Sequence, residues 1–412
     1  MSKLLPPSLA GSRLVVAIDP GKAQHRVWLS TSDDGLLVEP LSVPVLRAGL
    51  DRVSGLIADH DGGDGPVIAI EATGSLHGPW ASALEARFPA SVRIFAPSET
   101  AAARAQLGSR RFKTDDRDCA ALTYLARQGH GRRLMDDPVA ELRAAVRHRR
   151  GLVAERKVAQ QRLHDQLNGL CPGLSAPAGH GRVLELEHTS GQAVLNCAVA
   201  FNGRPPSVRS LLARSPGRIL PTHAAYWVDR WKQCLPPPAD ASTRAERLGR
   251  SVARWQTIRA DIAVVDADIE RLLATTDGQV LTSLPGVATV RAATFAAFTL
   301  PIERFPTAEH LYSATGLAPA KYQSATINRH GRISRTGLAE HRDALMGIAW
   351  GLSKFSGPFT DRDRELRARG MSPIQARVAI ARHACRLTYR MLTTQQPFDE
   401  QRYRQGRHQG GR

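Results

Sequence analysis

The stretch LVVAIDPGK, residues 14–22, decides the fold of the N-terminal part of the chain. It opens with the unbroken apolar run LVVAI, which is typical of a strand buried on both faces, and the run ends at Asp19 before a Pro-Gly turn. A second run of this kind, VIAIE, ends at Glu71. Each of these two predicted buried strands therefore ends in a carboxylate.

The segments around these two strands complete an α/β unit. Alternating residues at 26–30 and 36–43 predict a hairpin meander, and apolar spacing predicts helices at about 45–59 and 79–86. A further strand is expected at 92–96, followed by more helix. Three strands, then helix, strand, helix, strand and helix, form the order of an RNase H-like fold, which we therefore expect here.

Two long helical patterns follow, at 138–170 and at about 241–275. A stretch interrupted by Pro and Gly, at about 175–238, lies between them and predicts an irregular insertion. We expect residues 138–275 to form an antiparallel coiled-coil linker that acts as an oligomerisation arm. Two helices packed onto one domain are the alternative.

The C-terminal region, residues 276–396, is expected to be a mostly helical domain with Gly turns. Within it, LTSLPGVATVRAATFAAF looks like a helix-hairpin-helix, whose turn at Pro285 and Gly286 would hold a phosphate through backbone N–H groups. A plain helix turn is the alternative. The basic tail, residues 397–412, has little to bury and is expected to be disordered.

Composition narrows the class of protein. The 412 residues include 56 Lys and Arg against 38 Asp and Glu, a net charge of +18, which points to a polyanionic partner. No apolar run approaches the ~18 residues of a membrane-spanning helix, and the N-terminus lacks the apolar core of a signal peptide. The five cysteines are scattered without a CxxC pair, which fits a reducing compartment. We expect a cytoplasmic, nucleoid-associated protein that binds nucleic acid and no membrane.

The acidic residues suggest a metal site. Asp19 and Glu71 would emerge from neighbouring strands, and the helix start KTDDRDCAAL adds Asp115 and Asp118, one turn apart on one face, while Asp116 points elsewhere. Four converging carboxylates require a hard cation such as Mg²⁺. The alternative is that KTDD is only a helix cap with an acidic first turn.

A serine surrounded by cations lies further along the chain. Ser324 stands in a loop bounded by Gly and Pro, and a serine beside a metal site can attack a phosphodiester while cations stabilise the transition state. A serine that merely caps a turn or binds phosphate is the alternative, and Ser313 and Ser334 are the competing serines. The expected nucleic-acid-binding residues are Lys113, Pro285, Gly286, Lys321, Arg329, Arg332, Arg335 and Arg342.

These motifs together resemble one family. AIDPGK, IEATG, KTDDRDCAAL, LPGVATV and the series FPTAEHLYSATGLAP, KYQS and GRISRTG look like those of the insertion-sequence 110 transposases, the bridge-RNA-guided DEDD/serine recombinases. The likeness covers residues from about 14 to 170 and from 241 to 349. It implies a RuvC-like domain at 1–130 and a serine transposase domain at 276–396.

The resemblance also implies catalytic roles. The tetrad would be Asp19, Glu71, Asp115 and Asp118, which would hold Mg²⁺, and the nucleophile would be Ser324. In the family this serine commonly precedes Gly, whereas Ala325 follows it here. The implied reaction is strand exchange between donor and target double-stranded DNA through a 5′-phosphoserine intermediate.

The family likeness further implies partners. A guide (bridge) noncoding RNA would pair with both DNAs, and the protein would work as a homotetramer with sites composed of two protomers. Two other classes of protein stay open. A Mg-dependent Holliday-junction-type nuclease would activate water at the tetrad and leave Ser324 structural, and a non-catalytic nucleic-acid-binding protein would need neither group.

Overall fold

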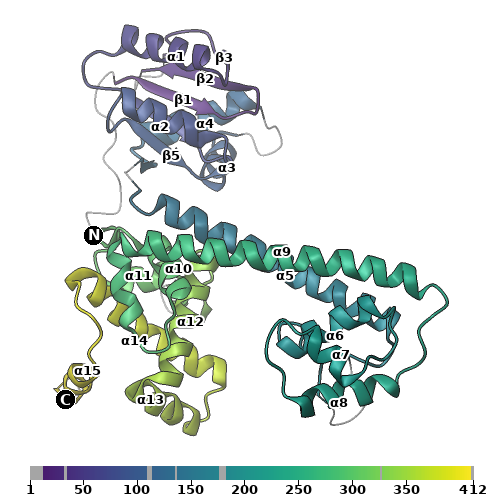
Figure 1. Cartoon of the computed structure of the whole chain (residues 1–412). Helices are drawn as coiled ribbons and strands as arrows, with labels where there is room; N and C mark the ends of the chain where they lie inside the picture. The colour runs from purple at the N-terminus through teal and green to yellow at the C-terminus, as the bar shows by residue number, and fades with distance from the viewer. Residues whose placement is uncertain are drawn as a thin grey trace. The chain divides into compact units, whose positions relative to one another are not determined.

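The chain folds into two compact units, Met1–Asp136 and Asp137–Arg412. The computed structural model (Figure 1) describes residues 13–31, 35–108, 114–134, 137–175, 182–324 and 327–409, without the side chains of 321–332 and 405–409. Lys113 and Ala325 lie outside the described residues.

The first unit is built on a mixed six-stranded sheet in the order β3-β2-β1-β4-β5-β6. Strands β1, β4 and β5 are parallel, while β2, β3 and β6 pair antiparallel. Its elements are β1 Val15–Asp19, β2 Gln24–Ser30, β3 Leu41–Pro44, α1 Arg47–His60, β4 Val67–Glu71, α2 His77–Arg87, β5 Val92–Phe95, α3 Pro97–Gln106, α4 Asp115–Arg127 and β6 Arg132–Arg133. The expected order of strands and helices is confirmed.

Both faces of this sheet are covered, which explains why β1 and β4 are apolar throughout. Val16 and Ile18 of β1, with the residues of the same parity on β4, pack with α1 and α2 into one core cluster. The residues of opposite parity, Ala17 and Ala69 among them, pack against Cys119 and Leu122 of α4. The alternation therefore assigns every second residue of β1 and β4 to the α4 face.

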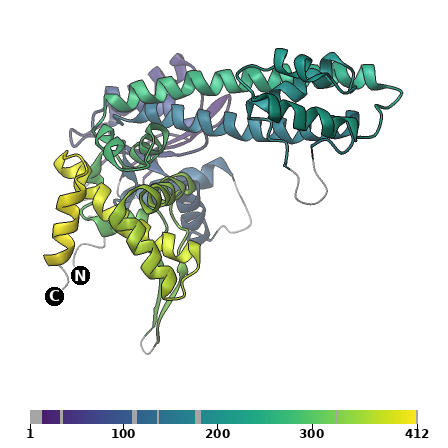
Figure 2. The ribbon, with the colours of Figure 1, turned by 60° about the horizontal axis from the view of Figure 1, so that its bottom comes forward.

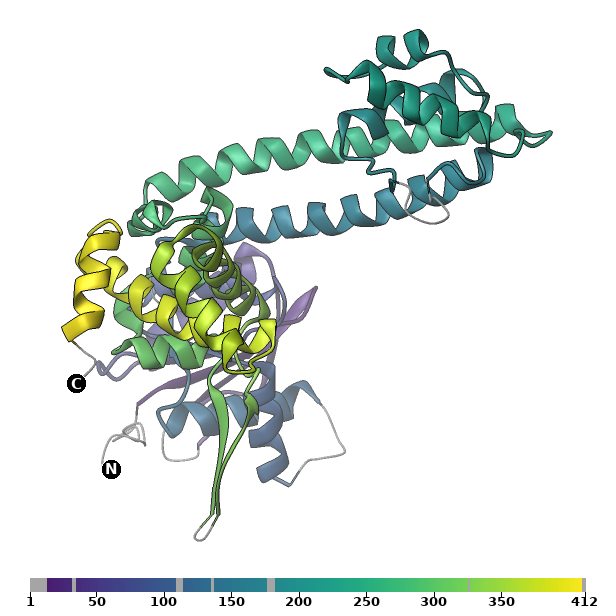
Figure 3. The same cartoon turned by 90° about the horizontal axis from the view of Figure 1, so that it is seen from below.

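Two long helices, α5 Ala140–Leu170 and α9 Ala241–Ala274, lie side by side in the second unit (Figure 3). The start of α5 and the end of α9 share one core cluster, and the end of α5 and the start of α9 share another, so the pair is antiparallel. Arg149 donates to the carboxylate of Asp266 across the pair. Antiparallel packing is thus established, while coiled-coil supercoiling and a role in oligomerisation stay predictions.

The region expected to be an irregular insertion is instead a helical cluster. It contains α6 Thr189–Ala200, α7 Val208–Ala213 and α8 Pro221–Lys232. Trp227 and Trp231 are buried in its core, and the indole N–H of Trp231 donates to the carbonyl of Gly203 at 2.9 Å. The prediction was wrong because the Pro and Gly residues lie between these helices and bound them, and do not mark irregular chain throughout.

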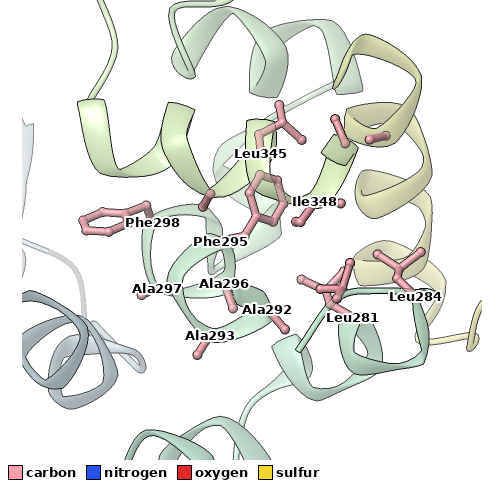
Figure 4. Packing of buried hydrophobic residues seen from close by; sticks show 14 of the residues in the cluster. Leu281, Leu284, Ala292, Ala293, Phe295, Ala296, Ala297, Phe298, Leu345 and Ile348 are labelled. Carbon is pink, nitrogen blue, oxygen red and sulfur yellow. The ribbon is translucent and has the colours of Figure 1, made fainter. Parts of the chain in front are cut away.

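The C-terminal part of this unit is the mostly helical region that was expected. Phe295 of α10 packs against Leu345 and Ile348 of α12 (Figure 4), and the same core extends to α5, α9 and α14. The elements are η1 Asp277–Ser283, α10 Thr289–Thr299, η2 Ile302–Arg304, α11 Ala308–Ala314, β7 Pro319–Ser324, β8 Ile327–Ile333, α12 Ala339–Phe355, α13 Gly357–Ala368, α14 Pro373–Thr394 and α15 Glu400–Gln409. Because this core runs across residue 275, the expected second and third domains share one core.

Two details of this region differ from expectation. The first arm of the expected helix-hairpin-helix is a 3₁₀ helix, η1, and only the second arm, α10, is α-helical. Within the tail expected to be disordered, Glu400–Gln409 forms α15, because Tyr403 stacks on Phe359 with ring centroids 4.9 Å apart and Phe398 packs beside it. Two aromatic side chains therefore anchor a segment whose composition is otherwise polar.

Strands β7 and β8 form a separate two-stranded antiparallel hairpin. Figure 2 and Figure 3 both show it projecting from the C-terminal helices. No helix in the described parts of the chain is long and apolar enough to cross a membrane.

Candidate active site

The predicted acidic pair lies at one edge of the sheet in the first unit. The parallel register of β1 and β4 runs to Ile18 opposite Ile70, so Asp19 and Glu71 are the next residues on neighbouring strands. Residues level with each other on parallel strands point to the same face, and parity places both on the α4 side. Glu71 is 8% exposed and accepts a hydrogen bond from Thr73 Oγ1 at 3.0 Å.

Helix α4 begins over this face of the sheet. Thr114 caps it by accepting a hydrogen bond from the backbone N–H of Arg117, and acidic residues in its first turn suit the positive end of the helix dipole. Asp115 and Asp118 are separated by about one turn, on the face that continues through Leu122 into the core. Asp118 is buried and Asp115 is exposed.

The cysteine that follows Asp118 is not a nucleophile. The thiol of Cys119 is buried and lies 3.5 Å from the carbonyl oxygen of Arg26. Burial, and after it the charge of Asp19, raises the pKa of Cys119 well above its ordinary value. The thiol stays protonated at neutral pH, so it cannot supply the thiolate that an attack would need.

A clamp that the sequence did not predict fixes the start of α4 to β2. Arg26 Nε donates to Asp116 Oδ1 at 2.6 Å, and the indole N–H of Trp28 donates to the same oxygen at 3.0 Å. The hydrogen bond from Arg26 holds the pKa of Asp116 below its usual range. Arg26 also stands opposite Asp19 in the antiparallel register, so a cation borders the acidic pair. The signal in the sequence was the i, i+2 spacing of Arg26 and Trp28 on one strand face.

Asp118 has a partner of its own. Its carboxylate forms an ion pair with Arg104 in the last turn of α3, and the side chains of the two residues are 2% and 17% exposed. The sequence did not reveal this pairing, because it joins two helices through tertiary packing.

The fit of these residues to Mg²⁺ follows from this geometry. Carboxylates are the donors that a hard cation prefers, and Asp19 and Glu71 are neighbours. However, within the described ranges no three His, Cys, Asp or Glu residues lie close enough to hold a metal ion, and Asp118 is held by Arg104. The arrangement described does not fit the ion, and the metal role of the tetrad stays a prediction.

The expected serine belongs to the second unit. Ser324 is the last residue of β7 and is paired with Ile327 on β8. Lys321, Arg329 and Arg332 are placed on the same hairpin by their backbones alone. Of the competing serines, Ser313 lies in α11 and Ser334 follows β8.

Two expected cations follow the hairpin. Arg335 is exposed and has a left-handed backbone with φ of 56°. Arg342 lies on α12, and its buried Nη1 has no hydrogen-bond partner among the described residues. No contact with nucleic acid follows from these placements, so the binding roles stay predictions.

The Pro285–Gly286 turn packs closely against α12. Gly286 has φ of +72°, and a Cβ on it would lie 2.3 Å from Phe355 Cδ2 and 2.8 Å from the carbonyl oxygen of Gly351. Arg291 donates to the carbonyl of Gly286 at 3.0 Å. Glycine is therefore required here for packing, whether or not the turn also holds a phosphate.

Comparison with known proteins agrees with this arrangement. A family model described as "Transposase IS116/IS110/IS902 family" matches residues 278–363, and a DEDD transposase model of the IS110 type matches residues 16–172. The chain is 28% identical over 303 residues to an uncharacterized 44.8 kDa protein of insertion element IS116 from Streptomyces clavuligerus, covering 69% of this chain and 72% of the relative. It is 28% identical over 294 residues to an uncharacterized 43.6 kDa protein of insertion element IS110 from Streptomyces coelicolor, covering 68% of this chain and 70% of the relative.

The two family models together span the acidic sheet edge with α4 and the hairpin that carries Ser324. The resemblance seen in the sequence motifs is thereby confirmed, and the chain belongs to the IS110/IS116/IS902 family of insertion-sequence transposases, enzymes that recombine DNA.

Proposed function

We propose that this transposase joins donor and target DNA by strand exchange through a covalent 5′-phosphoserine intermediate on Ser324. The observation that carries the proposal is the register of β1 and β4, which sets Asp19 beside Glu71 on the face covered by the acidic first turn of α4. The position of Ser324 at the end of the β7 ladder, in a chain of this family, supports its role as the nucleophile.

The chemistry balances as two transfers. In the first, Ser324 Oγ bonds to the scissile phosphorus, the bond from phosphorus to the 3′ oxygen breaks, and a proton lost from the serine is matched by one gained at the 3′ oxygen. In the second, the 3′ hydroxyl of the other DNA attacks the phosphoserine, the bond from phosphorus to Ser324 Oγ breaks, and the proton lost from the hydroxyl is matched by one gained at Oγ. Cations near the serine favour the charged transition state.

The partners in this proposal are double-stranded donor and target DNA, a guide (bridge) RNA that supplies sequence specificity, and other copies of the chain in a homotetramer. The net charge of +18 supports a scaffold that holds nucleic-acid backbones of both kinds. In such a scaffold, base pairing reads the sequence and the protein binds shape and charge.

The test is a covalent trap. The full-length protein, the RNA encoded at the ends of its element and end-labelled donor and target DNAs are incubated with Mg²⁺ and resolved on a denaturing gel. We expect a slow, protease-sensitive DNA band that Ser324→Ala abolishes and that the control Ser353→Ala, on α12, retains. Cleaved DNA without an adduct, unchanged by Ser324→Ala, would instead support a junction nuclease that activates water.

A further inference from the structure

A cavity of about 770 Å³ lies in the second unit at the base of the β7–β8 hairpin. It is formed by α11, the first residues of β7, the segment after β8, and α14. Its volume falls in the range of ligand-binding pockets and exceeds that of one phosphate group. Among the residues whose side chains the structure describes, none of those expected to bind nucleic acid lines it.

The cavity carries uncompensated positive charge. Arg382 and Arg386 reach it from successive turns of α14. Arg386 Nε donates to Glu309 Oε1 at 3.1 Å, which neutralises one charge. Arg382 is exposed and forms no hydrogen bond or ion pair with any residue that the structure describes. One guanidinium, with its fork of N–H donors, is thus available to an anion.

Hydroxyl groups complete the wall. Tyr312 lines the cavity although only 9% of its surface is exposed. Burial raises its pKa, so its hydroxyl stays protonated and can donate a hydrogen bond at neutral pH. Ser313 also lines the cavity, as do Ser334 and Thr336, whose hydroxyls are hydrogen-bonded to each other at 3.0 Å. A site with one guanidinium and several hydroxyl donors favours a phosphate over a neutral ligand.

We propose that this cavity binds a phosphodiester of a nucleic-acid strand, with Arg382 paired to the phosphate. The inference rests on the proposed function, since it assigns a further contact to the same nucleic-acid substrate. Pro319 lines the cavity and Ser324 is five residues further along β7, about 17 Å at the rise of a strand. A strand running along the hairpin would then meet Arg382 about one β7 length away from Ser324.

The test compares Arg382→Gln with Arg369→Gln, which removes an equal charge from an exposed residue outside the cavity. Binding of a labelled DNA duplex and of a labelled RNA hairpin is measured by fluorescence anisotropy over a range of salt concentrations. In at least one of the two arms, we expect Arg382→Gln to weaken binding about tenfold and to lower the salt slope by about 0.9, the value for one phosphate contact. The arm that changes identifies the strand as DNA, RNA or both.

The outcome that overturns the proposal is equal affinity and equal salt slope for the two variants in both arms. A matching unfolding temperature excludes a loss of fold, and Arg382→Lys, which keeps the charge, is expected to regain the salt slope but not the full affinity. All variants are made in a Ser324→Ala background, where no adduct is expected. The binding result therefore stands even if the adduct predicted for the wild type fails to form.

Discussion

Arg104 in α3 forms an ion pair with Asp118 in α4, and Asp118 is 1% exposed. A buried carboxylate of this kind depends on its counter-charge, because an unpaired charge in the interior is strongly destabilising. The same carboxylate belongs to the predicted tetrad. A divalent cation can therefore use Asp118 only if Arg104 releases it.

Replacing Arg104 tests this competition. Arg104→Gln should lower the free energy of unfolding in chelator by about 3 kcal/mol, because Asp118 loses its partner. Added Mg²⁺ should restore more stability to this variant than it adds to the wild type. Thermal unfolding with and without the ion gives both values.

Arg87→Gln is the matched control, since it breaks an exposed ion pair with Asp51 in the same unit and should change stability little. An equal response to Mg²⁺ in wild type, control and Arg104→Gln would contradict the view that Arg104 and a cation share Asp118.

His341 makes the stability of the second unit depend on pH. It is buried on α12, its Nε2 lies 3.0 Å from Thr299 Oγ1, and its ring faces Phe295 at 5.1 Å. Burial, and after it the charge of Arg304, lowers its pKa to about 4. In the unfolded chain His341 binds a proton near pH 6.5, whereas in the folded chain it does not. The stability that the neutral histidine contributes is therefore complete above pH 6.5 and is lost as the pH falls toward 4.

The shift corresponds to about 3 kcal/mol over that interval. Denaturant unfolding of wild type and His341→Gln at a series of pH values measures this free energy. The variant should not lose the part of its stability that the wild type loses when His341 becomes protonated. His188, an exposed histidine, provides His188→Gln as the control. Parallel pH profiles for wild type and His341→Gln would show that His341 is not the group responsible.

The turn at Gly286 should tolerate no side chain. Gly286→Ala combines a positive φ with a Cβ only 2.3 Å from Phe355 Cδ2, so it should cost more than the backbone strain alone, about 2–4 kcal/mol in total. Gly370→Ala is the control, because Gly370 has φ of +86° and a Cβ on it would meet nothing within 4 Å. Chemical denaturation compares them, and equal losses would mean that α12 moves aside freely.

The parts of the fold that could be predicted from sequence are those with strong local signals. The apolar runs before Asp19 and Glu71 predicted two central strands, and the acidic turn after Thr114 predicted the start of α4, all of which the structure contains. Register then follows from topology, since parallel neighbours that end together bring their last residues level.

What could not be predicted depends on contacts between distant residues. The pairing of Arg104 with Asp118 and the cavity at Arg382 arise when helices pack, and nothing in local spacing records them. The helices around Trp231 pack into a core that they share with α5 and α9, and Tyr403 of α15 stacks on an aromatic ring of α13. In each case contacts between distant residues stabilise a structure that the local helix propensity favours only weakly.

The measurement that tests the central claim most directly is peptide mapping of the covalent adduct. Tryptic cleavage after Lys321 and Arg329 releases YQSATINR, residues 322–329, in which Ser324 is the single serine. After nuclease digestion of the bound DNA, we predict that mass spectrometry finds the residual nucleotide on this peptide, attached at Ser324. A nucleotide on a peptide that carries Ser313 or Ser334, or joined DNA strands with no modified peptide, would contradict the account.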